Sequence, residues 1–357
     1  MKAALCQRAR QLGFDACRVT SADPPPHASR FKAWLEAGRH GTMAYLVRTA
    51  AQRADPRVLL PGARSVVTLA ASYWQAPAPP PAPASPQLRG FVARYARHAD
   101  YHDVLAQRIE QVCAFVATLD DPAPRSMACV DAGPVLERDL AQRAGIGFIG
   151  KHTNLVSRQL GNWFFLAEIL TTLELEPDPP QANRCGSCAR CLEACPTRAL
   201  IAPFELDARR CIAYLTIEFK GPIPVEVRPA IGNRIFGCDD CLSVCPWNRF
   251  ARAGGLMREH ARPDLAEPDL LEMLRLDDSG FRSRFADTPL ARAKRRGLLR
   301  NVCVALGNIA TAAALPALES AARDPEPLIA EHASWALTRI RQRQAHRLLT
   351  RQSDFAR

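Results

Sequence analysis

The sequence lacks any long apolar run. No window of its 357 residues approaches the ~18 apolar residues that a membrane-spanning helix requires. Its first residues, MKAALCQRARQLG, mix charged and apolar side chains where a signal peptide needs an unbroken apolar segment. We therefore expect a globular, cytoplasmic protein with no membrane segment, long enough for two or three domains.

The sequence also gives little reason to expect disulfides. It contains 13 cysteines, an odd number, and a reducing cytosol favours metal binding or catalysis by cysteine over a disulfide framework. Four of the cysteines lie in RCGSCARCLEACPTRAL, residues 184–200, with the spacing CxxCxxCxxxCP. Bacterial ferredoxins carry this run, and its fourth cysteine binds the other of two iron–sulfur clusters.

A partial copy of this run supports that interpretation. GCDDCLSVCPWN repeats its last three cysteines and its proline, and Cys211 can supply the missing first cysteine after a long insertion. We predict two [4Fe-4S] sites with crossed ligands. Cluster 1 would be bound by Cys185, Cys188, Cys191 and Cys245, and cluster 2 by Cys195, Cys211, Cys238 and Cys241.

Zinc is the alternative metal that these cysteines could bind. Structural zinc sites use paired CxxC units with a longer spacer, which explains neither the third closely spaced cysteine nor the two prolines. The remaining cysteines lie on apolar faces of expected elements, where free thiols are usually buried. They are Cys6, Cys17, Cys113, Cys129 and Cys303.

Alternating strand and helix patterns over the first half of the chain predict an α/β domain. Expected strands include 15–22, 65–74 and 125–133; expected helices include 28–46, 100–119 and 135–145. A β-hairpin is expected at 155–175, with a Gly-Asn turn. The proline-rich segment 75–87 is expected to be a surface loop without a function of its own.

Helical periodicity replaces the strand signals from about residue 265. VALGNIA at 304–310 and WALTRIR at 335–341 lie 31 residues apart, a period typical of HEAT-like helical hairpins. We thus expect three domains: an α/β domain at 1–178, a ferredoxin-like domain with two clusters at 179–255 and an all-α HEAT-like domain at 265–357.

GIGFIGK, residues 145–151, matches GxGxxG but not the dinucleotide fingerprint, because a helix precedes the glycines and a strand-like run follows them. A tight turn and a glycine-lined cofactor contact both remain open. Asp131, at the end of an expected strand, is a candidate proton donor, although turn or helix-cap roles explain it equally well. Glu137 has the same ambiguity.

The chain is strongly basic. Its formal charge is +11, and residues 291–357 contain 12 Lys or Arg against 5 Asp or Glu. This asymmetry fits a polyanionic partner, but a solvated arginine-rich surface explains the charge equally well.

Four segments carry a resemblance to a known family. VDAGPVLERDLAQRAGIGFIGKHTNLVSRQLGNWFFLAEILTTLEL, the first cysteine run, DARRCIAYLTIEFKGPIP and IGNRIFGCDDCLSVCPWN resemble the epoxyqueuosine reductases. An ordinary ferredoxin shares the cysteines but neither DAGPVLER nor YLTIE. The resemblance implies a nitroreductase-like domain that holds cobalamin, reduction of the cobalt through the two clusters, and conversion of epoxyqueuosine to queuosine at the tRNA wobble position.

The resemblance also implies roles for particular residues. Asp131 matches the proton donor. Positions matching the corrin-lining segments are Arg53, Asp131, Lys151, Thr153, Asn154, Asn162 and Trp163. Positions matching a surface that meets the anticodon loop are Lys220, Arg228, Asn233 and Arg234, and the basic helical tail would help to bind tRNA. An external low-potential electron donor and a monomer are expected.

The chain departs from the family at a few positions. Ala132 or Gly133 stands where the family often has Ser, Phe148 stands for Trp, and Asn162 stands for Ser. Two alternatives remain: a reductive dehalogenase-like enzyme acting on small organohalides, and a non-catalytic ferredoxin fused to a helical scaffold. The dehalogenases usually carry an export signal, and the second alternative leaves Asp131 unexplained.

Overall fold

The structure is a computed structural model that describes residues 1–76 and 88–355, with side chains up to residue 346. The chain forms two compact units. Unit 1 comprises the described part of Met1–Pro77, with His98–Arg209 and Asp240–Ala261. Unit 2 comprises the described part of Ala78–Arg97, with Arg210–Asp239 and Arg262–Arg357. The two units divide the expected ferredoxin-like segment between them, and most of the proline-rich segment lies outside the described residues.

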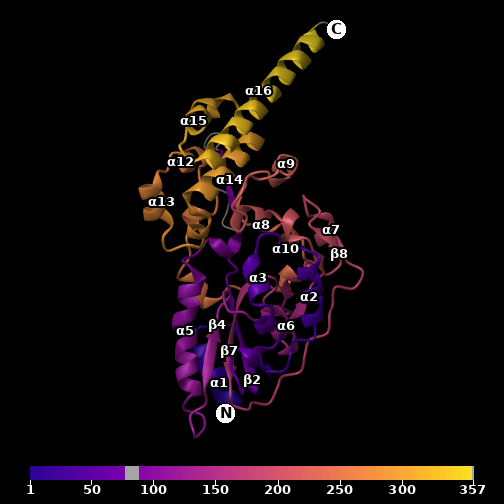
Figure 1. Ribbon diagram of the computed structural model, residues 1–357, viewed down its shortest axis with the longest axis vertical. Coiled ribbons are helices and arrows are strands. Elements are labelled where there is room, and N and C mark those ends of the chain that lie inside the picture. Colours follow the sequence, from indigo (N-terminus) through magenta and orange to yellow (C-terminus); the bar gives the residue numbers. More distant parts are fainter. Residues whose placement is uncertain (77–87, 356–357) are drawn as a thin grey trace. The chain divides into compact units, whose positions relative to one another are not determined.

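Unit 1 is built on a four-stranded sheet (Figure 1). Its strand order is β1 (Ala16–Ser21), β2 (Ser65–Ser72), β7 (Phe164–Thr171) and β4 (Ser126–Cys129). Every neighbouring pair is antiparallel. The alternation of strands and helices in the sequence correctly indicated a mixed α/β unit. The sequence pattern did not determine the strand directions. Because the sheet is antiparallel, Asp131 does not lie in the ligand crevice that forms at the carboxyl ends of parallel strands.

Helices cover both faces of this sheet. On one face Phe165 of β7 stacks on Tyr101 of α5 (Tyr101–Val116), with ring centroids 4.1 Å apart, and α5 also packs against α1 (Lys2–Gln11). On the other face Leu166 and Leu170 of β7 belong to clusters that include residues of α6 (Glu137–Arg143). Because side chains alternate along a strand, Glu168 points to the α6 face.

The short elements of unit 1 surround this sheet. They are α2 (Ala28–Glu36), α3 (Ala44–Arg48), α4 (Ala50–Ala54), β5 (Phe148–Ile149), β6 (Leu155–Val156), α7 (Arg190–Glu193), β8 (Leu200–Ala202), β9 (Glu205–Leu206), α10 (Asp240–Ser243) and α11 (Gly255–Arg258). The expected helix 28–46 is wrong in its middle: it is divided into α2 and α3, and Gly38 and Gly41 between them both have φ of +63°. Such φ values end a right-handed helix.

The expected hairpin at 155–175 is also wrong. β6 pairs with β5, whereas β7 pairs with β2 and β4. Only a single bridge, Ser157 to Gly161, joins the two β-rich runs. Gly161, at φ +65°, does make the expected turn, but the second run is a buried central strand, and its partners lie far away in the sequence.

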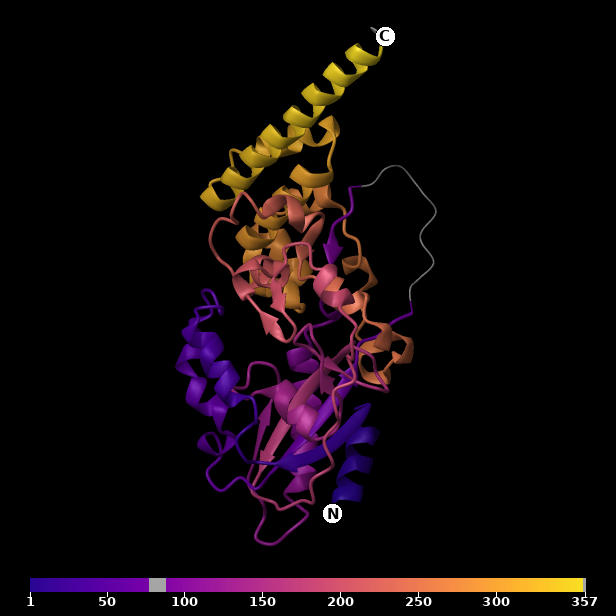
Figure 2. The same cartoon turned by 90° about the vertical axis from the view of Figure 1, so that its right-hand side faces the viewer.

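Unit 2 is mainly helical (Figures 1 and 2). Its elements are β3 (Phe91–Val92), α8 (Ile212–Ile217), α9 (Arg228–Ile231), β10 (Arg234–Phe236), α12 (Leu270–Leu274), α13 (Asp278–Phe285), α14 (Lys294–Ile309), α15 (Leu315–Ala321) and α16 (Pro327–Phe355). The core forms around α14, which packs along α16 and against α12 and β10. The predicted helical tail is confirmed as helical, and its HEAT-like arrangement remains an interpretation.

Candidate active site and cluster site

Asp131 lies in a tight turn just after β4. Its φ of +48° is in the left-handed region, which few residues other than glycine adopt, although Asp and Asn tolerate it. Gly133 lies so close to Cys129 that a Cβ atom on it would meet the Cys129 Cβ at 2.4 Å. The turn therefore depends on glycine at 133, and it leaves the Asp131 side chain 46% exposed.

Two side chains at the start of α5 contact the Asp131 carboxylate. The Tyr101 hydroxyl donates a hydrogen bond to Asp131 Oδ2. His102 Nε2 lies 3.2 Å from the same oxygen, and His102 Nδ1 lies 2.6 Å from Asp100 Oδ1. Asp100 is also the N-cap of α5, because its carboxylate accepts the His102 backbone N–H. The helix start thus fixes both the tyrosine and the histidine beside Asp131.

Two carboxyl groups lie behind Asp131 on the α6 face of the sheet. The Glu137 carboxylate accepts a hydrogen bond from the Asp131 backbone N–H. Glu168 is 0% exposed and lies opposite Thr68 and Cys129 in the strand register. Within the described part of the chain, neither oxygen of Glu168 has a hydrogen-bond partner, and Oε1 of Glu137 has none.

Burial dominates the electrostatics of these two groups. It raises the pKa of Glu137 to about 8, and repulsion from Asp131 adds to this rise. Burial, with repulsion from Glu137 and Asp131, also raises the pKa of Glu168 well above its ordinary value. Part of the Glu137 residue reaches the surface, but its Oε1 is sealed from solvent. Because this oxygen is buried, the protonated form of Glu137, like that of Glu168, is favoured near neutral pH.

The predicted corrin-lining residues fall into two groups. Arg53, Thr153 and Asn154 are partly exposed and lie around the start of α6. Arg53 Nη1 donates to the Val135 carbonyl at 3.1 Å, and Arg138 Nη1 donates to the Thr153 carbonyl at 2.8 Å. This rim of guanidinium, hydroxyl and amide groups beside an exposed carboxylate has the hydrogen-bonding capacity that the amide side chains of a corrin require. The donor set therefore fits cobalamin.

The other three predicted corrin contacts have structural roles. Lys151 Nζ donates to the carbonyls of Gly186 and Cys188, at 2.8 Å each. Asn162 Nδ2 donates to Asn248 Oδ1 at 2.8 Å. Trp163 is 1% exposed and stacks with Trp74 in the core. The Trp163 ring therefore lies inside the unit, and its contact with a corrin stays a prediction.

The GIGFIGK segment is shaped by its own packing. A Cβ atom on Gly145 would meet the Pro179 carbonyl oxygen at 2.4 Å, and one on Gly147 would meet the Val156 carbonyl oxygen at 2.3 Å. These glycines allow close backbone contact within the protein. Of the two open interpretations, the structure favours the tight turn over a glycine-lined cofactor contact.

The four cysteines predicted for cluster 1 all lie in unit 1. Electrostatic contacts join Cys185 to Cys188, Cys191 and Cys245, so these four thiols are neighbours. The Lys151 backbone N–H donates to the Cys185 sulfur, and its ammonium holds the loop between Cys185 and Cys188. The segment from 148 to 154 therefore links the Asp131 side of unit 1 to the first cysteine loop.

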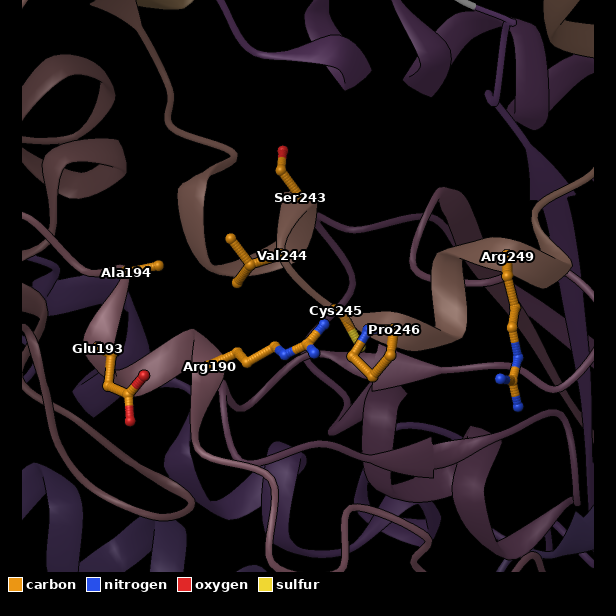
Figure 3. Close-up of a pocket in the computed structure, with 8 residues that line it drawn as sticks. All are labelled: Arg190, Glu193, Ala194, Ser243, Val244, Cys245, Pro246 and Arg249. Atoms are coloured by element: carbon orange, nitrogen blue, oxygen red, sulfur yellow. The ribbon is translucent and has the colours of Figure 1, made fainter.

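Cys245, a predicted ligand of cluster 1, lies near the surface. An open groove of about 720 Å³ runs between α7 and α10, and Cys245 forms part of its wall (Figure 3). Arg190, Arg249 and Glu193 line it together with the exposed Val244. The groove brings solvent close to one thiolate of the cluster site.

None of the 13 cysteines forms a disulfide. In the described part of the chain, no three His, Cys, Asp or Glu side chains are placed to hold a single metal ion. The cysteines predicted for cluster 2 are divided between the units: Cys195 and Cys241 lie in unit 1, and Cys211 and Cys238 lie in unit 2. Cluster 2 stays a prediction from the spacing. The remaining cysteines Cys17, Cys129 and Cys303 are buried, and Cys6 and Cys113 are half-buried.

The four predicted tRNA contacts lie in unit 2. Arg228 is 1% exposed, with Nη2 2.5 Å from Glu331 Oε1 and its guanidinium over the Trp335 ring. The surface position expected for Arg228 is wrong, because its guanidinium is buried and links α9 to α16 inside unit 2. Lys220 is exposed, while Asn233 donates to the Arg89 carbonyl and Arg234 to the Ile231 carbonyl.

Sequence reasoning missed Tyr101, His102 and Glu168. The segment DYHDV at the start of an expected helix gave a usable signal for the first two, because an N-cap aspartate fixes the following side chains. Glu168 also carried a signal: an acid inside the apolar run FFLAEIL is expected to be partnered or functional when buried.

Comparison with known proteins gives the family. Residues 53–132 match the family model of the epoxyqueuosine reductase QueG, and residues 184–248 match a 4Fe-4S double cluster binding domain. An epoxyqueuosine reductase of Pseudomonas aeruginosa is 40% identical over 92% of this chain and 92% of its own length. The chain belongs to the epoxyqueuosine reductase family. Like its relatives it is an oxidoreductase, and its cysteine-rich segment is a 4Fe-4S cluster binding domain.

Further epoxyqueuosine reductases agree with this assignment. That of Escherichia coli is 38% identical over 92% of this chain and 86% of its own length. A solved epoxyqueuosine reductase, crystallised with an epoxyqueuosine-modified tRNA-Tyr stem loop, has a TM-score of 0.87 at 34% identity, covering 95% of this chain and 90% of that chain. That of Streptococcus thermophilus has a TM-score of 0.86 at 30% identity with the same coverage. Among the described residues, no helix is long and apolar enough to cross a membrane.

Proposed function

We propose that this protein reduces epoxyqueuosine to queuosine at the wobble position of tRNA, with Asp131 as the proton donor. The observation that carries the proposal is the Asp131 site itself. Tyr101 and His102 hold the half-exposed Asp131 carboxylate. The Asp131 backbone is in the left-handed region, a strained conformation of the kind that proteins keep at functional sites. Full-length identity of about 40% to epoxyqueuosine reductases supports the substrate. We therefore favour this activity over the dehalogenase-like and electron-transfer alternatives.

Cobalamin and two [4Fe-4S] clusters are the proposed cofactors. Arg53, Thr153 and Asn154 would hold the corrin, and the eight cysteines between 185 and 245 would bind the clusters. When bound, cobalamin would supply a strongly reducing, nucleophilic centre for opening the epoxide. An external low-potential donor would deliver electrons to the clusters, and the protein would act as a monomer.

The chain's own residues perform the proton chemistry. Opening an epoxide places negative charge on its oxygen, and a nearby acid stabilises that charge by giving a proton. Asp131 presents its carboxyl group to solvent on a rim of polar groups, where a substrate can reach it. Tyr101 and His102 orient this group through the two contacts at Oδ2. The Asp131 turn thus places the acid, and α5 fixes its direction.

The tRNA partner is proposed from the family and the charge. The related protein crystallised with a tRNA stem loop shows that such enzymes bind this substrate, and this chain carries a net charge of +11. A wobble base must leave the anticodon stack to reach a buried reactive centre. We expect exposed basic residues of unit 2, including Lys220, to contact the phosphates.

One experiment tests the function. The protein is purified without oxygen, reduced with dithionite in the presence of cobalamin, and mixed with a tRNA stem loop that carries epoxyqueuosine. Mass spectrometry of the nucleosides should show queuosine formed at the expense of epoxyqueuosine. If epoxyqueuosine persists in a preparation with full iron content, the proposed activity is wrong, and a halogenated phenol as substrate would then test the dehalogenase alternative.

A further inference from the structure

The proposed reaction needs two protons. Converting an epoxide to an alkene and water consumes two electrons and two protons: one proton is added to the oxygen when the first C–O bond breaks, and one when the hydroxyl group leaves as water. The clusters supply electrons only. The inference that follows rests on the proposed function, and it concerns the source of the second proton.

The solvent-facing pair at the site holds one transferable proton. An ionised Asp100 carboxylate can only accept hydrogen bonds, so the 2.6 Å contact assigns a hydrogen to His102 Nδ1. The 3.2 Å contact between His102 Nε2 and Asp131 Oδ2 then contains one further proton, on either the imidazole or the carboxyl group. After this proton has been donated, Asp131 must be protonated again before the second C–O bond can break.

Two buried carboxyl groups interact electrostatically with Asp131 and are candidates for the second proton source. Glu137 accepts the Asp131 backbone N–H through one oxygen, and its other oxygen is sealed and unpartnered in the described part of the chain. Glu168, fully buried on the same face of the sheet, has no partner for either oxygen among the described residues. An ionised carboxylate without hydrogen bonds is very unfavourable in such a place. Glu168 is therefore stable there only while it carries a proton, and burial favours the protonated form of Glu137 as well.

The surrounding charges set which group ionises first. Glu137 faces the guanidinium groups of Arg53 and Arg138 and the carboxylate of Asp131. Glu168 faces the two other carboxyl groups and Cys129. Burial raises the pKa of Cys129 to about 12, so this thiol stays neutral. Glu137, with two cations nearby, is therefore the group that can release a proton toward Asp131.

We propose that Glu137 and Glu168 form a buried proton reserve that reprotonates Asp131 between the two C–O bond cleavages. The O–H bond of Glu137 breaks and a new O–H bond forms on the Asp131 carboxylate. Glu168 keeps its proton, and the Asp131 backbone N–H and the guanidinium groups of Arg53 and Arg138 stabilise the Glu137 carboxylate in the meantime. Solvent restores the lost proton after product has left. Glu137 is a positioning and proton-supplying residue, and Asp131 remains the group that touches the substrate.

The first test uses the resting holoprotein without substrate. Infrared spectra near pH 7 should show the C=O stretch of protonated carboxyl groups, and the isosteric variants Glu137→Gln and Glu168→Gln should each remove part of this band. The exposed Glu176→Gln variant is the control and should leave the band unchanged. A band that survives in both variants overturns the reserve. This readout does not depend on the proposed activity.

The second test follows single turnovers on an epoxyqueuosine stem loop. Glu137→Gln should slow queuosine formation by about tenfold or more above pH 8, and much less at pH 6, where solvent protons can replace the reserve. Glu176→Gln should match the wild type at both values. Equal slowing at all pH values indicates a merely structural role and overturns the proposal. A wild-type protein that forms no queuosine would instead contradict the proposed function. If Glu168→Gln fails to fold, Glu137→Gln decides the result.

Discussion

At the scale of single residues, the left-handed conformation of Asp131 makes an unusually clean variant available. Asn adopts φ near +48° as readily as Asp does, so Asp131→Asn should keep the turn and remove only the acid. We expect product formation to fall by about 10²–10⁴-fold, the typical contribution of a general acid. Nucleoside mass spectrometry measures this loss.

The matched control for Asp131→Asn is Asp103→Asn. Asp103 lies on the exposed side of α5, close to Tyr101 and His102 in sequence. The Asp103→Asn variant should retain full activity. Iron content and stem-loop affinity should be unchanged in both variants. An active Asp131→Asn enzyme would remove Asp131 from the mechanism.

Glu137 gives a prediction for stability against pH. Its pKa is raised to about 8 in the folded protein, from an ordinary value near 4.5. A raised acid pKa means that the stabilising effect of the neutral form is complete below pH 4.5 and is lost as the pH rises toward 8. Glu137→Gln cannot ionise, so its stability relative to the wild type should increase over this range. We expect a gain of about 2–4 kcal/mol at pH 8.5, since each pKa unit is worth ~1.4 kcal/mol.

Thermal unfolding of the anaerobic holoprotein measures this gain. The difference in Tm between Glu137→Gln and the wild type should be small at pH 5 and should favour the variant at pH 8.5. If the Tm difference between the variant and the wild type is the same at both pH values, Glu137 ionises with an ordinary pKa. Glu176→Gln provides the surface reference.

At the scale of elements, two glycines of α14 have opposite predicted effects. A Cβ atom on Gly307 would meet the Trp335 ring at 2.4 Å and the Ala336 Cα at 3.1 Å, so Gly307→Ala should push α16 away from α14. We expect a loss of about 1–3 kcal/mol, typical of overpacking. A Cβ atom on Gly297 would find its nearest neighbour at an ordinary 3.6 Å, so Gly297→Ala should stabilise the helix by up to about 1 kcal/mol.

A denaturant titration followed by tryptophan fluorescence measures the stability of both variants, and Trp335 lies at the contact itself. The two variants change the same helix by the same methyl group and differ only in what the methyl group meets. A stabilising Gly307→Ala would contradict the close approach of α14 and α16.

The segment from β5 to β6 connects the Asp131 side of unit 1 to the first cysteine loop through Lys151. Its ammonium binds the carbonyls of Gly186 and Cys188, so Lys151→Met should loosen the first cysteine loop. We expect faster loss of iron when the protein is exposed to air or to a chelator. Iron release followed by visible absorbance measures this rate. The exposed Lys32→Met is the control. Equal rates would show that the loop is held by its thiolates alone.

These elements also show how far sequence reasoning reaches. The cysteine spacing predicted the 4Fe-4S domain because ligand geometry is local, and the turn at Gly161 was predicted for the same reason. The pairing of β7 with β2 and β4 could not be predicted, since partners far apart in sequence are selected by packing. The family resemblance assigned Arg228 to a surface that meets the anticodon loop, whereas here Glu331 and Trp335 stabilise it internally. Glu168 was overlooked although a single acid inside an apolar run is itself a signal, because its neighbours Asp131 and Glu137 are brought to it only by the fold.

At the scale of the whole molecule, iron content tests the cofactor prediction. Two [4Fe-4S] clusters require about eight iron atoms per chain in anaerobically purified protein. Replacing Cys245 with Ser should remove about half of the iron, because the assignment places Cys245 in cluster 1 alone. Chemical iron analysis measures both values. Stoichiometric zinc without iron would overturn both sites.

The charge of the whole chain gives the last prediction, on tRNA binding. Lys220 shares a basic patch with Lys294 and Arg296. Its residue is exposed, but partial burial of its ammonium and repulsion from neighbouring cations, including these two, lower its pKa. Lys294 and Arg296 are both exposed. If this patch binds phosphates, the affinity for the stem loop must fall with salt, because each contact releases a counterion.

The variants Lys294→Gln and Arg296→Gln should each reduce the slope of log affinity against log salt by about 0.7–0.9, the value expected for one phosphate contact. Fluorescence anisotropy of a labelled stem loop over a salt series measures the slopes. Lys32→Gln carries the same change of charge in unit 1 and should leave the slope unaltered, since only net charge would change. If all three variants lower the slope equally, the basic character of the chain acts as a general field; if only the two unit 2 variants do so, the patch is a phosphate-binding surface.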